Sequence, residues 1–336
     1  VYKRQDLGQP QANRSFTAKE ADSIKSNFKL INAAEYIISK AKNHKITIIN
    51  EAHHNSSHRF FARSLLKALY DQGYRHLGIE ALVPSDMDPL LNSRKYATQE
   101  SGNYVVDPQF GNLVREALEI GYTLFSYDSF EFGNGKPREI AQANHIKAVM
   151  DAHPEDKILI YCGFEHAMEG SHWSWEKTMA GRLQEYTGID TLTVDQTHYN
   201  ERHDKDYNPP LLKLLDFRSP KVLVDSTDKS MGYQFRGMYA DIAVLHPTND
   251  SSQSRPAWMF DHHNQAIELD VKDADIDFPI MVLAYKLDEE YTDAIPYDIL
   301  EVKSSKQHSV LALESGDYNI ILNSKTKSLV FTTHVD

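Results

Sequence analysis

The 336-residue sequence contains a single cysteine, Cys162. One thiol cannot form an intramolecular disulfide, and a zinc module built from several cysteines is excluded as well. Cys162 follows an apolar, strand-like run and precedes a glycine. We therefore expect a buried, inert thiol rather than a nucleophile.

The sequence also lacks an excess of basic residues and any long hydrophobic run. Its net charge of −12 argues against nucleic acid as a partner, and no basic cluster suggests an anionic membrane surface. No apolar stretch is long enough to span a bilayer. The remaining composition, 41% hydrophobic and 25% charged residues, is typical of a globular protein.

The first residue is valine rather than methionine, so we expect that the native start is missing. We expect residues 1–25 to be a disordered or non-native segment. A signal peptide or lipid anchor could have been lost with the native start. We therefore expect an exported bacterial protein, either periplasmic or a lipoprotein.

Strand-like and helix-like segments alternate over residues 26–250, which predicts an α/β domain with a largely parallel central sheet. Strands are predicted at 46–50, 76–80, 122–127, 157–162, 190–194, 220–225 and 240–245. Helices are predicted at 29–42, 57–72, 109–120, 137–152 and 173–187. A Ser/Pro-rich linker at 251–276 and a small β-sandwich-like module at 277–336 complete the chain.

Four of the predicted strands end in ionisable residues. Because the carboxyl ends of parallel strands meet at one edge of a sheet, these side chains are expected to converge there. In an extended chain, Glu51 and His53 share one face and His54 points the other way. The residues at the four strand ends are Glu51, His53 and His54, then Glu80, then Asp128, and finally His166.

Other residues are candidates for substrate contact or for support of the site. Arg138 follows a proline at a helix start, where it could clamp an anion, hold a site carboxylate, or be exposed. His58 and Arg59 lie one turn into the second helix; His58 could equally be an exposed first-turn residue. Asp195 and His246 each end a strand, and Asp195 could be a simple turn residue.

Two long irregular segments, 83–106 and 197–220, are expected to cap the edge of the sheet and to set specificity. The sequence of these segments does not identify a ligand. We read Trp173 and Trp175 as packing or pocket-wall residues and the adjacent His262 and His263 as solvated side chains.

The run Asn50-Glu51-Ala52-His53 with the later Gly163-Phe164-Glu165-His166 resembles the two G-x-x-H-type motifs of the erythromycin esterase-like and ChaN-like superfamily. That superfamily includes the Tiki/TraB-type proteases. The resemblance covers about residues 30–250 and extends to Glu80 and the helix at 138–144. It implies a three-layer α/β/α sandwich with the site at the carboxyl edge of the sheet. Asn50 replaces the expected glycine, and we expect its side chain to narrow the approach to a ligand.

These residues favour a hydrolase acting on an ester, lactone or amide bond of a small molecule or peptide. A histidine oriented by Glu51 or Glu80 would act as general base on water, with His166 as electrophile or second proton donor. Arg138 would stabilise developing negative charge. Alignment with the esterases makes His54 the base and alignment with ChaN and Tiki makes it His53, so both remain open.

A metal-dependent variant of this hypothesis uses His53, His166, Glu51 and Glu80 as ligands of Mn, Zn, Co or Fe. The alternatives to a hydrolase are a ChaN-like protein that binds haem or iron through histidines or tyrosines, and a non-catalytic binding protein that acts through its β module. The sequence leaves the oligomeric state open.

Overall fold

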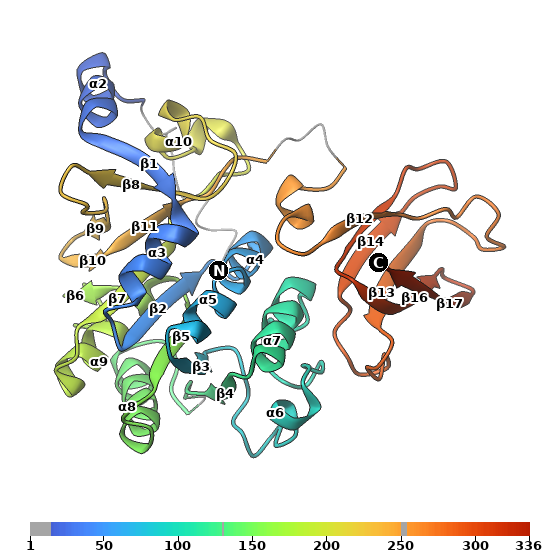
Figure 1. Ribbon diagram of the computed structural model, residues 1–336, viewed down its shortest axis with the longest axis horizontal. Helices are drawn as coiled ribbons and strands as arrows, with labels where there is room; N and C mark the ends of the chain where they lie inside the picture. The colour runs from blue at the N-terminus through green and yellow to red at the C-terminus, as the bar shows by residue number, and fades with distance from the viewer. Residues whose placement is uncertain (1–14, 130, 250–253) are drawn as a thin grey trace.

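An eight-stranded sheet forms the centre of the computed structural model, which describes residues 15–129, 131–249 and 254–336 (Figure 1). From one edge to the other, its strands are β1 (Phe28–Asn32), β8 (Lys221–Asp225), β11 (Ile242–Leu245), β7 (Thr191–Tyr199), β2 (Ile46–Glu51), β5 (Lys157–Gly163), β3 (Tyr74–Ile79) and β4 (Thr123–Ser126).

The sheet is largely parallel, as predicted. The strands from β11 to β4 all pair in parallel, while β8 pairs antiparallel with both of its neighbours. The central strand β2 is buried along its whole length. Such burial on both faces explains why its sequence is a continuous apolar run rather than an alternation.

Helices cover both faces of the sheet, so the three-layer architecture is confirmed. Alternate residues of β5 show the two faces: Ile158 and Ile160 pack in one hydrophobic cluster, Leu159 and Tyr161 in the other. The first cluster includes residues of α8 (Lys136–Ala152) and α9 (Met179–Thr187); the second includes residues of α3 (Ala33–Ala41), α4 (Ser56–Arg63), α5 (Leu66–Asp71) and α7 (Pro108–Ile120).

Several helix boundaries differ from the prediction. Residues 28–32 form strand β1, and α3 starts only after Asn32, whose side chain accepts a hydrogen bond from the Glu35 N–H. Such a cap ends the strand and begins the helix at one residue. The predicted helix 57–72 is two helices, α4 and α5. Helix α9 begins six residues later than predicted, after its cap Thr178.

The expectation of disorder at the N-terminus is wrong for the residues that the structure describes there. Helix α2 (Ala18–Asn27) begins with a capping box between Thr17 and Glu20, a sequence signal that the prediction overlooked. Residues 1–14 lie outside the described residues.

Short elements fill the connections. The predicted strand 240–245 divides into β10 (Met238–Ala240) and β11, and β10 forms a small sheet with β6 (Glu169–Gly170) and β9 (Tyr233–Phe235). The remaining short elements are the helices α6 (Leu91–Arg94) and α10 (Pro210–Leu214) and the 3-10 helices η1 (Phe164–Ala167), η2 (Lys205–Tyr207) and η3 (Ala257–Phe260).

The C-terminal module consists of two antiparallel sheets that share one hydrophobic core. The larger sheet contains β14 (Asp298–Val302), β13 (Ile280–Lys286), β16 (Gly316–Asn323) and β17 (Ser328–Val335), and the smaller contains β12 (Gln265–Glu268) and β15 (Val310–Leu313). Strand β12 lies within the range expected to be a linker, so part of that segment belongs to the module. No described helix combines the length and apolarity needed to cross a membrane.

Buried ion pairs attach this module to the α/β domain. Arg115 on α7 donates to both carboxylate oxygens of Glu289, at 2.5 and 2.6 Å. Arg63 on α4 donates to Glu314 at 3.0 Å and to the Tyr297 hydroxyl at 3.0 Å. Figure 1 shows the module beside α4 and α7. The position of the module on the α/β domain is therefore fixed by these ion pairs as well as by apolar contacts.

We predict that Arg115→Ala destabilises the protein by about 3–5 kcal/mol, because it leaves the buried carboxylate of Glu289 without its cation. Urea unfolding followed by circular dichroism measures the effect. Lys67→Ala, which removes an exposed pair with Asp71, is the matched control and should leave the midpoint nearly unchanged. Equal effects of the two substitutions would show that the Arg115 pair does not fasten the module.

Candidate active site

The ionisable strand ends converge, as predicted, on a cavity of about 550 Å³ at the carboxyl edge of the sheet. Strands β2, β3 and β5 and the segment after β4 contribute to its wall. So do the two long segments that we expected to cap the edge, through Asn103 and Tyr104 and through residues from Thr197 to Arg202. The predicted residues on the wall are Glu51, His53, His54, Glu80, Asp128, Arg138 and His166.

Glu51, at the end of β2, is a buried and fully paired carboxylate. Arg59 donates to both of its oxygens at 2.7 Å, and the Tyr161 hydroxyl donates to Oε2 at 2.8 Å. Burial alone would raise the pKa of Glu51, but the hydrogen bonds from Arg59 and His53 lower it to about 2. Glu51 is therefore ionised at every physiological pH.

His53 is oriented by this carboxylate. Its Nδ1 lies 2.9 Å from Oε1 of Glu51, which makes Nδ1 the protonated nitrogen and Nε2 the basic one. Tyr104 stacks on the imidazole with ring centroids 4.2 Å apart. A Cβ at position 163 would lie only 2.5 Å from Nε2 of His53, so Gly163 is required for the imidazole to reach this place.

Arg138 holds two carboxylates. Of the three alternatives that the sequence left open for it, the structure shows the one in which it holds a site carboxylate. It donates to Oε1 of Glu80 at 2.7 Å and to both oxygens of Asp128 at 2.7 and 2.8 Å. Burial would raise the pKa of Asp128, but hydrogen bonds from Arg138 lower it. The other oxygen of Glu80 accepts a hydrogen bond from the Gly163 N–H at 2.5 Å. Glu80 thus lies between α8 and β5.

His166 lies between two carboxylates. Its Nδ1 is 2.8 and 3.0 Å from the oxygens of Glu139, and its Nε2 is 3.3 Å from Oε1 of Glu80. Burial alone would lower the pKa of His166, but the charges of Glu80 and Glu139 raise it to about 9. Trp175 stacks on the ring with centroids 5.3 Å apart. His166 is therefore an imidazolium at neutral pH.

A third histidine–carboxylate pair reaches the cavity from β7. The Nδ1 of His198 lies 2.9 Å from Asp195, and Tyr233 stacks on the His198 ring at 3.5 Å between centroids. Burial would raise the pKa of Asp195, but the charge of His198 and the surrounding hydrogen bonds lower it well below its usual value. Asp195 itself is fully buried, so it holds His198 rather than facing the cavity.

Asn50 does not narrow the approach to a ligand, contrary to our expectation. Its buried side chain donates to the Phe164 carbonyl at 2.7 Å and to Asp195 at 2.8 Å, and accepts from the Gln196 N–H at 2.7 Å. The asparagine therefore joins β2 to the ends of β5 and β7. Phe164 has a left-handed backbone (φ 44°), an unfavourable conformation for a phenylalanine, and Asn50 helps to hold it.

Three residues predicted to contact substrate lie instead behind the cavity wall. Arg59 is hydrogen-bonded to Glu51, and Asp195 is hydrogen-bonded to His198 and Asn50. The Nδ1 of His58 accepts a hydrogen bond from the Ala52 N–H at 3.0 Å, and its Nε2 lies 2.9 Å from Asn200. Burial lowers the pKa of His58 to about 4, so it is neutral. These side chains position the wall.

A second cavity of about 430 Å³ adjoins the first. His54 and Asn200 line both, and Phe60, Phe61 and Trp258 give the second cavity an aromatic wall. His246 lines it as well, with Nε2 3.0 Å from Gln196, and burial keeps its pKa well below the usual value. If His246 contacts a substrate, as predicted, it does so in this second cavity and not in the first.

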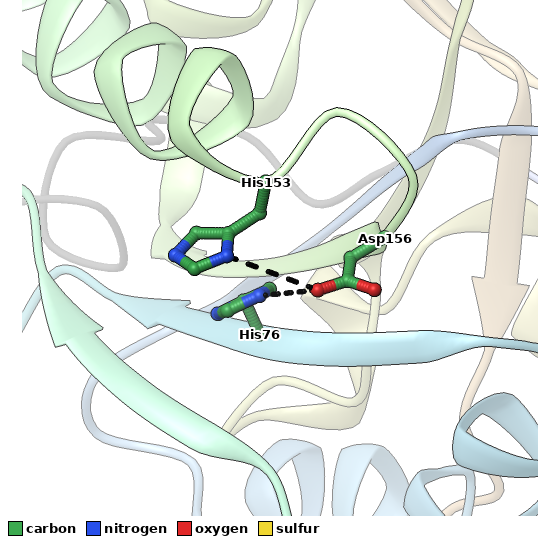
Figure 2. Close-up of side chains that lie close together, drawn as sticks. All are labelled: His76, His153 and Asp156. Carbon is green, nitrogen blue, oxygen red and sulfur yellow. Dashed lines mark hydrogen bonds and ion pairs between the residues drawn. The ribbon is translucent and has the colours of Figure 1, made fainter.

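The four predicted metal ligands are not gathered around one point. Both oxygens of Glu51 accept hydrogen bonds from Arg59, and Oε1 of Glu80 accepts one from Arg138. In the described part of the chain, the group of ligand atoms close enough to share an ion is His76, His153 and Asp156, at the opposite edge of the sheet (Figure 2). The active-site residues in this arrangement do not fit a divalent metal.

Sequence reasoning missed Glu139 and did not assign roles to Tyr104 and His198. Glu139 follows Arg138 directly in the first turn of α8, which was the signal for it. Trp175 is a wall residue, as expected, although it precedes α9 rather than leading it. His262 contacts Glu116 at 3.0 Å, so it is more than a solvated side chain. Cys162 is buried and burial raises its pKa, as expected of an inert thiol.

No protein-family model and no curated protein matches this chain. Among solved structures, the type III effector HopBA1 is 13% identical with a TM-score of 0.35, over 54% of this chain and 94% of HopBA1. RRSP, a MARTX toxin effector domain from Vibrio vulnificus CMCP6, is 18% identical with a TM-score of 0.36, and the chain spans only 38% of its length and 54% of its own. ChaN of Campylobacter jejuni, described for cofacial heme binding, is 10% identical with a TM-score of 0.36, over 66% of this chain and 98% of ChaN. TM-scores this low carry no weight for function, and membership of the erythromycin esterase-like and ChaN-like superfamily stays a prediction.

We predict that His166 titrates near pH 9. A pKa raised above the unfolded value of about 6.5 stabilises the fold fully below that pH, and this stability is lost as pH rises through about 9. NMR titration of the histidine Cε1–H signals, with His166 assigned through His166→Gln, measures the midpoint. Glu139→Gln should lower it by removing one of the two charges, and Glu185→Gln on the exposed side of α9 should not. A midpoint near 6.5 in the unaltered protein would contradict this account.

Proposed function

We propose that this protein is a metal-independent hydrolase of an ester, lactone or amide bond. The supporting observation is that His53 and His166 lie on either side of Gly163 and Glu80, and that their carboxylate partners differ. A Cβ at position 163 would meet both Nε2 of His53 and, at 3.2 Å, Oε2 of Glu80, while Oε1 of Glu80 contacts His166. A substrate carbonyl in this cavity would therefore have a base and an acid within one small region.

His53 is the general base in this mechanism. Glu51 fixes its tautomer through Nδ1, so Nε2 takes a proton from a water molecule as the water oxygen attacks the carbonyl carbon. His166 cannot take this role at neutral pH, because its raised pKa keeps it protonated. Our preference for His53 over His54 rests on the 2.9 Å contact between His53 Nδ1 and Glu51 Oε1, which orients the imidazole.

His166 provides the positive charge and the acidic proton. Its imidazolium stabilises the oxyanion that forms on the carbonyl oxygen, and then donates a proton to the leaving oxygen or nitrogen as the bond to carbon breaks. To restore the site, His53 releases its proton to solvent and His166 takes one up from solvent. Arg138 acts as a positioning residue, because its donors hold Glu80 and Asp128 beside His166.

The second cavity supports a substrate with a bulky apolar part. Its aromatic wall directly adjoins the polar cavity, and such walls bind apolar groups while a few polar residues orient the reacting group. We infer a compound whose reacting carbonyl lies beside His53 and whose apolar portion extends past His54 toward Phe60, Phe61 and Trp258.

We predict that His53→Ala lowers kcat by about 10²–10⁴-fold, the usual contribution of a positioned general base. His54→Ala, the matched control on the adjacent residue, should change kcat by less than about tenfold, because the proposed mechanism gives His54 no proton to transfer. Initial rates on a panel of esters, lactones and peptides, with and without EDTA or added Mn²⁺ and Zn²⁺, measure both variants.

Equal losses in the two variants would contradict the assignment of the base. Activity that requires added metal would contradict the metal-independent mechanism. If the folded protein hydrolyses nothing in the panel but forms a Soret band on addition of haem, the hydrolase proposal fails in favour of the haem-binding alternative.

A further inference from the structure

A compact group of histidine and aspartate side chains lies at the amino edge of the central sheet, opposite the candidate active site. It consists of His76 near the start of β3, His153 directly after α8, and Asp156 just before β5 (Figure 2). Residues 79–80 and 163–166 of the active site lie at the other ends of these same strands. The group is thus separate from the cavity and takes no part in the proposed hydrolysis.

The three side chains direct ligand atoms at one another. Oδ2 of Asp156 lies 2.9 Å from Nε2 of His76 and 4.0 Å from Nδ1 of His153. All three ligand atoms lie within 4.8 Å of one another. Ligands of a tetrahedral zinc ion, at about 2.0–2.1 Å from the metal, are separated by about 3.4 Å. The observed separations bracket that value, so rotation of the side chains suffices to surround an ion.

Local backbone structure explains how the group forms. The pairing of β3 with β5 shifts register between Tyr74 and His76, and such an irregularity re-aims a side chain. His153 and Asp156 belong to one turn, closed by a hydrogen bond of 3.2 Å from the Asp156 N–H to the His153 carbonyl. The His76 and His153 rings lie 4.2 Å apart between centroids. Three ligands therefore come from one strand and one turn.

A simple ion pair between His76 and Asp156 explains only part of this arrangement. It would leave unexplained why the His153 ring lies against His76 and faces the same carboxylate oxygen, as Figure 2 shows. The neighbouring lysines do not compete for Asp156 in this structure: Lys157 donates to the Lys42 carbonyl at 2.7 Å and Lys45 to the Pro154 carbonyl.

We propose that His76, His153 and Asp156 bind a divalent transition-metal ion of the Zn²⁺ type. Imidazole nitrogens with one carboxylate oxygen suit zinc, nickel and copper rather than magnesium or calcium, which prefer oxygen ligands alone. The side chain of His76 is 8% exposed, whereas those of Asp156 and His153 are 37% and 48% exposed. An ion can therefore enter from solvent, and water completes its coordination.

The bound ion would join the end of α8 to β3. The first turn of α8 carries Arg138 and Glu139, and β3 leads directly into Glu80, so the same two elements form the contact between Arg138 and Glu80 at the opposite edge. The metal would thus stabilise the relative position of the helix and strand that build the active site. Its role is structural, not catalytic.

The test uses the full chain without a histidine tag, titrated with ZnCl₂ by isothermal calorimetry and checked by metal analysis after dialysis. We expect one equivalent of Zn²⁺ per chain and a higher Tm in its presence. His153→Ala should weaken the affinity by at least about 100-fold, because loss of even an outer-shell partner costs about 10–100-fold. Asp156→Asn is a second variant with little effect on shape.

Two controls locate the ion. His308→Ala removes an exposed histidine of the C-terminal module and should leave zinc binding unchanged. His53→Ala should also leave it unchanged, which separates this site from any ion in the active-site cavity and keeps the result independent of hydrolysis. Undiminished binding in both His153→Ala and Asp156→Asn, or the lack of saturable binding in the unaltered chain, would overturn the proposal.

Discussion

The pairing of Arg59 with Glu51 is the interaction on which the site depends. Both side chains are almost fully excluded from solvent, and an isolated charge in such a place would cost several kcal/mol. The bidentate contact keeps Glu51 ionised, and an ionised Glu51 is what fixes the tautomer of His53. Because Arg59 lies on α4 and Glu51 ends β2, the pair also sets the position of that helix against the sheet. Removing either partner would affect the orientation of His53 and the fold together.

The same constraint recurs around the cavity. Arg138 pairs with both Glu80 and Asp128, and the imidazolium of His166 pairs with Glu139. Each pair joins different elements, so the buried ion pairs hold the strand ends, α4 and α8 at fixed distances from one another. A site assembled in this way is preorganised, since its dipoles and charges need not reorient during a reaction.

The sequence predicted the parts of this site that depend on local pattern. Apolar runs ending in Glu51, Glu80 and His166 identify buried parallel strands, and parallel strands bring their ends together. The sequence could not show which side chains face the cavity, because Arg59 and Asp195 look the same whether they contact a substrate or a neighbour. Tyr104 and Asn50 act through residues more than fifty positions away, or on other strands, and single-sequence periodicity carries no information about such contacts.

The different roles that we propose for His53 and His166 follow from their carboxylate partners rather than from the imidazoles themselves. His53 contacts a carboxylate that also accepts hydrogen bonds from Arg59 and Tyr161, and this carboxylate orients the ring. His166 contacts two carboxylates, and their combined charge raises its pKa to about 9 despite its burial. Environments that separate the protonation states of paired groups are the general basis of combined acid and base catalysis. In this protein the raised pKa of His166 is produced by Glu80 at the end of β3 and Glu139 on α8.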